Sequence, residues 1–227
     1  MKPVKKILLP ILLLLVAAGL AAALFCYRAT DEGLAALESD SVTVEKTDYG
    51  WRFDGPATDS ALIFYPGAKV DAAAYAPLLH RLAESDMDVC LVNMPLHIAL
   101  LGKDRADAVM AQHDYAHWYI GGHSLGGVMA ARYASTHELD GVILLAAYPI
   151  DAIDEPMLLI YGTEDGVLNR ARVAQSAQYG AVETFAIEGG NHALVGNYGE
   201  QAGDHPAQLS AAEQQRETVS LIEAWLA

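Results

Sequence analysis

Gly122-His123-Ser124-Leu125-Gly126 is the stretch of sequence that decides the fold. It follows a short apolar run ending at Ile120 and precedes a good helical stretch over residues 128–134. A serine between two glycines, where a strand turns sharply into a helix, stands clear of the sheet edge because neighbouring backbone comes too close for side chains. The pattern predicts a nucleophilic Ser124, and the alternative is a glycine-rich turn with an idle serine.

Short apolar runs alternate with amphipathic helical stretches on both sides of this turn. The predicted strands cover residues 41–46, 50–53, 61–65, 89–92, 118–120, 142–146, 157–161 and 182–187. The predicted helices cover residues 72–84, 104–112, 125–135, 169–178 and 210–226. Continuously apolar strands that alternate with helices are typical of a mostly parallel sheet covered on both faces. We therefore predict a single α/β domain.

Two polar residues follow later strands in the order that such a site uses, with the acid before the histidine. Asp165 leaves the end of the 157–161 strand and is the predicted acid, with Glu164 as the alternative. His192 leaves the end of the last strand and is the predicted base, with His205 as the alternative. A serine hydroxyl is a weak nucleophile without a base, so this set predicts acyl transfer through a covalent intermediate.

The same chemistry needs two preorganised donors for the oxyanion. The backbone N–H of Leu125 is the first predicted donor. The second is expected from the loop after the 61–65 strand, where Ala68 is the predicted residue and Lys69 is the alternative, because the sequence does not fix the turn. His123 is expected to shape the turn rather than to share the proton relay. This mechanism requires no metal and no organic cofactor.

An apolar run from Ile7 to Tyr27 carries no charge. Its 21 residues would span roughly 31 Å as a helix, which is the thickness of the hydrocarbon core of a bilayer. Three lysines among residues 1–6 predict that the N-terminus stays in the cytoplasm and that the rest is exported. The alternative is a cleaved signal peptide, since Ala21-Ala22-Ala23 satisfies the small-residue rule for cleavage.

These features divide the chain into three parts. They are a cytoplasmic stub and single-pass transmembrane anchor (1–28), a linker (29–41) and an extracytoplasmic catalytic domain (42–227) at the cell membrane. Residues 29–227 carry 10 basic and 29 acidic side chains, a net charge of −19, and such a surface repels nucleic acid. The expected partners are therefore a small-molecule acyl substrate and, through residues 7–27, the membrane.

These motifs together resemble the α/β-hydrolase superfamily, and most closely its small dienelactone-hydrolase-like members, over residues 41–227. The stretches at residues 65–70, 122–127 and 190–199 are also similar to membrane-tethered bacterial hydrolases of unassigned substrate. The resemblance implies the α/β-hydrolase fold and a serine hydrolase that cleaves a carboxylic ester or related acyl bond. Dienelactone hydrolases use a cysteine nucleophile, so Ser124 puts that particular substrate in doubt.

Two other functions fit the same residues. An acyl transferase or a thioesterase would use the same triad, and an inactive, membrane-displayed binding domain could retain the fold. Residues 148–155 are too few for a lid domain, which predicts an open site that favours small or loosely held acyl groups. The Gly-rich segment 193–208 is expected to border the pocket, and a plain connector is its alternative.

Overall fold

The computed structural model describes residues 10, 25–38, 41–56, 58–85 and 87–227. Most of the apolar run from residue 7 to 27, on which the predicted anchor and its cleavage alternative depend, lies outside the described residues. Among the residues that are described, no helix has the length and apolar character needed to cross a membrane.

Eight strands of the described chain form one sheet. They are β1 (Thr43–Lys46), β2 (Gly50–Asp54), β3 (Ser60–Tyr65), β4 (Asp88–Val92), β5 (His117–His123), β6 (Gly141–Leu145), β7 (Met157–Gly162) and β8 (Val182–Ile187). The α-helices are α2 (Asp31–Ala35), α3 (Ala76–Ala83), α4 (Arg105–Met110), α5 (Leu125–Ala134), α6 (Arg170–Val173) and α7 (Ala211–Leu226). Short 3-10 helices are η1 (Ala36–Glu38), η2 (Ala72–Tyr75), η3 (Pro95–His97), η4 (Ala99–Gly102), η5 (Ser176–Gln178) and η6 (Ala193–Val195).

The strand order is β1-β2-β4-β3-β5-β6-β7-β8. Strand β2 pairs antiparallel with β1 and with β4, and the pairs from β4 to β8 are all parallel. The carboxyl ends of β3, β5, β7 and β8 therefore meet at one edge, where ligands of such sheets bind. The mostly parallel sheet predicted from the sequence is confirmed.

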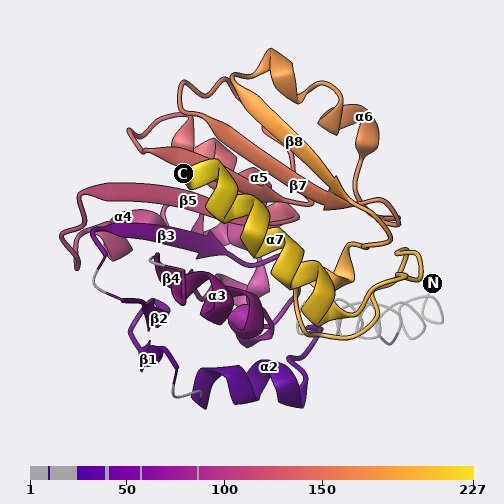
Figure 1. Ribbon diagram of the computed structural model, residues 1–227, viewed down its shortest axis with the longest axis horizontal. Coiled ribbons are helices and arrows are strands. Elements are labelled where there is room, and N and C mark those ends of the chain that lie inside the picture. Colours follow the sequence, from indigo (N-terminus) through magenta and orange to yellow (C-terminus); the bar gives the residue numbers. More distant parts are fainter. Residues whose placement is uncertain (1–9, 11–24, 39–40, 57, 86) are drawn as a thin grey trace, which may run out of the picture.

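Helices cover both faces of the sheet (Figure 1): α3 and α7 lie on one face, and α4 and α5 lie on the other. Strand β3 shows why its sequence is continuously apolar. Leu62 and Phe64 pack with the α3 and α7 side, whereas Ile63 and Tyr65 pack with the α4 and α5 side. Successive strand side chains point to opposite faces, and both faces are buried here. No cap domain covers the described sheet edge.

The described part of the predicted linker, residues 29–41, packs against the domain. The Thr30 N–H donates to the carbonyl of Asn197 at 2.8 Å, and the Thr30 side chain caps α2 by accepting from Gly33 N–H. The amide of Asn197 in turn donates to Glu32 at 2.9 Å. Helix α2 is thus held by hydrogen bonds to the segment around Asn197, which follows β8.

Candidate active site

Ser124 lies at the sharp turn between β5 and α5, with φ 52° and ψ −124°. A non-glycine residue in such a conformation is strained by of order 1–3 kcal/mol and persists only when its surroundings fix it. Its N–H donates to the carbonyl of Leu145 at 2.9 Å. A Cβ at Gly122 would lie 2.4 Å from the Tyr65 carbonyl oxygen, and one at Gly126 would lie 2.1 Å from it. Close approach of the end of β3 therefore explains both glycines of the motif.

Asp165 and His192 meet in a buried pair. His192 Nδ1 lies 2.8 Å from Asp165 Oδ2, and the two side chains are 1% and 0% exposed. The second oxygen, Asp165 Oδ1, accepts from the backbone N–H of Val167 and of Leu168, at 2.8 and 2.7 Å. A carboxylate can only accept, so Nδ1 carries a proton, and the lone pair of a neutral His192 ring lies on Nε2. His192 Nε2 has no hydrogen-bond partner among the described residues.

A cavity of about 290 Å³ is lined by both Ser124 and His192. Its other walls are mainly apolar, and they include Leu125, Val128, Ala146, Ala147, Ile150, Val167 and Leu168. Ligand pockets usually measure about 300–1,000 Å³, so this cavity is at the small end of that range. The arrangement can hold a small apolar acyl group beside the Ser124 hydroxyl and the His192 imidazole.

Glu164 and His205, the alternatives for the acid and the base, lie outside the cavity that Ser124 lines. Glu164 accepts from the side chain of Gln208 at 3.3 Å in an exposed contact. The His205 residue is exposed, and its carbonyl accepts from the amide of Asn191 at 2.8 Å. Neither lines the cavity that holds Ser124.

Asp165 is buried against His192 whereas Glu164 makes an exposed contact, so substitutions of these two adjacent residues can be compared. Asp165→Asn is expected to lower kcat by about 10⁴, because an amide no longer holds the imidazole in the tautomer that can accept a proton. Glu164→Gln, one residue away, is expected to leave kcat unchanged. Steady-state hydrolysis of a p-nitrophenyl ester measures both, and equal losses in the two variants would contradict the assignment of the acid.

Hydrogen bonds of the turn after β3 distinguish the two candidates for the second oxyanion donor. The N–H of Lys69 donates to the carbonyl of His97 at 2.7 Å, and that of Val70 donates to the carbonyl of Gly67 at 3.3 Å. The N–H of Gly67 donates to the hydroxyl of Tyr75. In the described turn 67–70, only Ala68 keeps an N–H without an acceptor. The turn thus favours Ala68 over Lys69. Leu125, the first residue of α5, offers a first-turn N–H that lacks an intrahelical partner.

Tyr75 links this turn to the residue before Ser124. Its hydroxyl is fully buried, accepts from Gly67 N–H at 3.0 Å and lies 2.8 Å from His123 Nδ1. Burial, and then the charge that neighbouring His192 can carry, hold the pKa of His123 well below its usual value. His123 is therefore neutral and accepts from Tyr75 at Nδ1, in keeping with a role in shaping the turn. No motif in the sequence points to Tyr75.

Removing this hydroxyl should affect catalysis as well as stability. Tyr75→Phe leaves the Gly67 N–H and His123 Nδ1 buried without partners, which costs about 1–3 kcal/mol. We expect kcat to fall as well, because the turn that carries Ala68 loses its tie. Tyr65→Phe is the matched control, since the Tyr65 hydroxyl also bridges two groups, the Lys103 carbonyl and the Ala106 N–H. Unfolding and kcat are measured on both, and a normal kcat in Tyr75→Phe would contradict this role.

The neutral state of His123 also predicts a pH effect on stability. Its pKa is lowered in the folded protein, so below about pH 6.5 the unfolded chain binds the extra proton first. Above about pH 6.5 the neutral His123 therefore costs the folded protein nothing. Below about pH 6.5 the free energy of unfolding falls by about 1.4 kcal/mol per pH unit, because the unfolded chain gains a proton that the folded protein does not bind. Urea unfolding in mild detergent at pH 7 and pH 5 should show a smaller loss for His123→Gln than for the unsubstituted protein, and identical losses would contradict it.

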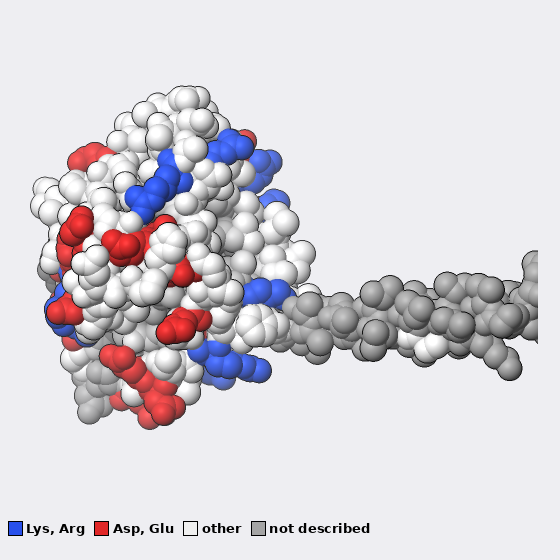
Figure 2. Space-filling model, turned by 90° about the vertical axis from the view of Figure 1, so that its right-hand side faces the viewer, with Lys and Arg blue, Asp and Glu red and all other residues white. Residues whose placement is uncertain are grey.

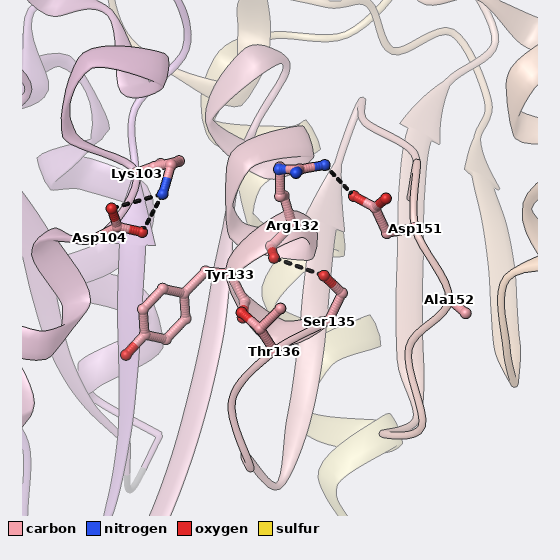
Figure 3. A pocket seen from close by; sticks show the side chains of 8 residues that line it. All are labelled: Lys103, Asp104, Arg132, Tyr133, Ser135, Thr136, Asp151 and Ala152. Carbon is pink, nitrogen blue, oxygen red and sulfur yellow. Dashed lines mark hydrogen bonds and ion pairs between the residues drawn. The ribbon is translucent and has the colours of Figure 1, made fainter.

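A second cavity, of about 350 Å³, lies beside the other end of α5 (Figure 3). Its two cations are already paired: Lys103 contacts Asp104 at 2.6 Å, and Arg132 contacts Asp151 at 2.7 Å. This hollow holds no unpaired charge for a ligand. Among the described residues, no group of three or more His, Cys, Asp or Glu side chains could hold a metal ion.

No residue of the segment 193–208 lines the Ser124 cavity, and most of the segment surrounds a separate cavity of about 450 Å³. The expectation that it borders the catalytic pocket therefore does not match the structure. Asp204 instead accepts from Ala193 N–H at 2.9 Å and from Gly166 N–H at 3.0 Å. It thereby ties the loop that follows the base to the loop that follows the acid.

A family model described as the alpha/beta hydrolase family matches residues 61–216. The chain belongs to this family. The match spans the sheet from β3 to β8, and with it Ser124, Asp165 and His192. Membership in the alpha/beta hydrolase family also accounts for the strand order and for the sharp turn after β5.

Solved structures share the fold of this hydrolase at low sequence identity. Esterase Est2 from Thermogutta terrifontis is 16% identical, with 82% of this chain and 90% of that chain covered and a TM-score of 0.56. A protein described as a predicted CIB-like hydrolase from Thermoplasma acidophilum is 14% identical, with 82% and 98% covered and a TM-score of 0.61. Mouse alpha/beta hydrolase domain-containing protein 10 is 12% identical, with 82% and 98% covered and a TM-score of 0.56. No curated protein matches the chain.

Proposed function

We propose that this chain is a serine hydrolase that cleaves a carboxylic ester or a related acyl bond. The observation that carries the proposal is the buried pair of His192 and Asp165, because His192 lines the same cavity as the strained Ser124 and its Nε2 has no hydrogen-bond partner among the described residues. Strained residues and buried titratable pairs inside a pocket are typical of catalytic sites. Membership in a hydrolase family supports the same reaction class.

In the proposed reaction, the Ser124 hydroxyl attacks the carbonyl carbon while His192 Nε2 takes its proton. Asp165 stabilises the imidazolium that forms, and the N–H groups of Leu125 and Ala68 donate to the oxyanion. Collapse of this intermediate breaks the bond to the leaving alcohol, which receives the proton from His192. Water then attacks the acyl-enzyme with His192 again as base, and the carboxylic acid leaves.

The cavity suggests which acyl groups suit this site. Its volume of about 290 Å³ and its Leu, Ile and Val walls favour short apolar acyl chains over long or charged ones. A charged acyl group would lose its hydration against these walls without gaining a partner. We therefore propose that kcat/KM is highest for short p-nitrophenyl esters and falls once the acyl chain outgrows the cavity.

We also propose that residues 7–27 anchor the enzyme in the cell membrane with the catalytic domain on the extracytoplasmic side. The uncharged run and the three lysines before it support this orientation.

Covalent labelling tests the hydrolase proposal. The full chain in mild detergent is incubated with a fluorophosphonate, an organophosphorus reagent. The Thermogutta esterase has been described as phosphoramylated by another organophosphorus compound, tabun. We expect one adduct, on the peptide that contains Ser124, together with loss of ester hydrolysis. An unmodified Ser124, or an adduct on another serine with the same loss, would overturn the proposal.

A further inference from the structure

The chain enters the domain directly at the catalytic edge. Tyr27 N–H donates to the carbonyl of Lys69 at 2.7 Å, and Asp71 N–H donates to the carbonyl of Tyr27 at 2.9 Å. Lys69 belongs to the turn after β3 that carries Ala68. The described chain at Tyr27 is therefore hydrogen-bonded directly to the turn that carries Ala68.

Exposed apolar side chains gather on the same edge. Leu96, Leu100 and Leu101 are 54%, 57% and 54% exposed, and they follow the carboxyl end of β4 in η3 and η4. This segment is joined to the catalytic turn because the carbonyl of His97 accepts from Lys69 N–H. Phe25, which is 53% exposed, packs its ring against Tyr27 at 5.0 Å between centroids. Single exposed apolar residues are ordinary, but a group at one place indicates a surface that contacts something apolar.

The backbone of this segment is held in an uncommon conformation. Leu96 and His97 have φ values of 51° and 55°, so two consecutive non-glycine residues adopt the left-handed region. A bulky residue rarely adopts this conformation unless the surroundings impose it. The fixed conformation leaves Leu96 more than half exposed, which gains nothing for the domain alone. Strain of this kind is common where a segment serves a binding role.

Charge on this side suits a lipid headgroup layer. Figure 2 shows Lys and Arg side chains on the side of the domain where the described chain begins, and many Asp and Glu side chains on the opposite side. Arg28, directly after Tyr27, is exposed. Basic side chains near a bilayer surface are attracted to anionic lipids, although the domain as a whole is acidic.

We propose that this edge docks on the lipid bilayer, with Phe25, Leu96, Leu100 and Leu101 inserted at the boundary between headgroups and acyl chains. This inference depends on the membrane anchor proposed above, and it does not depend on the proposed hydrolase chemistry. The anchor proposed above joins the domain at Tyr27, which is hydrogen-bonded to Lys69 and Asp71, and it therefore holds these side chains within reach of the membrane. The mouth beside Ser124 then faces the bilayer, and an ester dissolved in the lipid can reach it without crossing water.

Depth measurements on the full-length protein test this orientation. An NBD fluorophore is attached to Leu100→Cys, and in a second protein to Phe185→Cys, both with Cys26→Ser, because Cys90 is fully buried. Phe185 is the matched control, since it is 38% exposed on the far edge strand β8. Each protein is reconstituted in vesicles of phosphatidylcholine and phosphatidylglycerol. We expect nitroxide lipids to quench the label at 100, and aqueous iodide to quench the label at 185.

Three results would overturn the docking surface. The first is quenching of both labels by iodide. The second is protection of the label at 100 from both iodide and the nitroxide lipids, which a second copy of the protein would cause. The third is failure of the protein to float with the vesicles. Fluorophosphonate labelling of the same samples reports on Ser124 separately. A reactive Ser124 with an aqueous label at 100 rejects the docking surface alone, whereas an unreactive Ser124 with a lipid-quenched label rejects the hydrolase chemistry alone.

Discussion

Replacing Ser124 with alanine is expected to lower kcat for ester hydrolysis by on the order of 10⁶. The hydroxyl is the only group of the proposed triad that forms the covalent intermediate, so what remains is the contribution of binding and the oxyanion donors. The free energy of unfolding should hardly change, because alanine keeps the Cβ and leaves the hydrogen bond from the backbone N–H to the Leu145 carbonyl in place. Stopped assays with long incubation measure the residual rate.

Ser135→Ala, just after the end of the same helix, is the matched control for this experiment. Its hydroxyl donates only to the carbonyl of Arg132 at 2.8 Å in an exposed contact. We expect kcat to be unchanged there. Retention of more than about 1% of the activity in Ser124→Ala would place the nucleophile elsewhere.

His192→Ala is expected to cause a loss of similar size, on the order of 10⁶ in kcat, because the serine then lacks a base. It should also destabilise the fold, since Asp165 keeps a buried carboxylate whose Oδ2 has lost its partner. His205→Ala, at an exposed position, should change neither quantity. Ester hydrolysis and urea unfolding on the same preparations separate the two effects.

Combining the two substitutions gives a further check. Groups that act as one unit show strongly non-additive losses, so the double variant Ser124→Ala, His192→Ala should be about as slow as either single variant. A product of the two single losses, detected as a much slower double variant, would mean that the residues act independently.

The sequence was sufficient for the architecture because burial on both sheet faces leaves a simple pattern. Leu62 to Tyr65 can be read as a strand from composition alone, since every position faces a core. The order of Ser124, Asp165 and His192 follows from the rule that such sheets carry their chemistry at one edge. The choice of Asp165 over Glu164 was weaker, because adjacent carboxylates in a loop differ only in where their side chains point.

Other features depend on contacts that no local pattern encodes. The Tyr75 hydroxyl joins Gly67 to His123, which lies 48 residues from Tyr75 in the sequence. The turn proposed to bind the oxyanion depends on a hydrogen bond from Lys69 N–H to the carbonyl of His97, and the left-handed residues at 96 and 97 are not the glycines that usually mark this conformation. Leucines at 96, 100 and 101 likewise look like ordinary core positions until their exposure is known.

The loop after β7 has a consequence for anyone who redesigns the acyl preference. Val167 and Leu168 form part of the cavity wall, while their backbone N–H groups hold Asp165 Oδ1. Their side chains can therefore be exchanged to reshape the cavity, but proline at either position would remove one of the N–H donors to Asp165, the proposed orienting acid. Substitutions at these two positions can thus change the acyl preference without changing turnover, provided that both backbone N–H donors are kept.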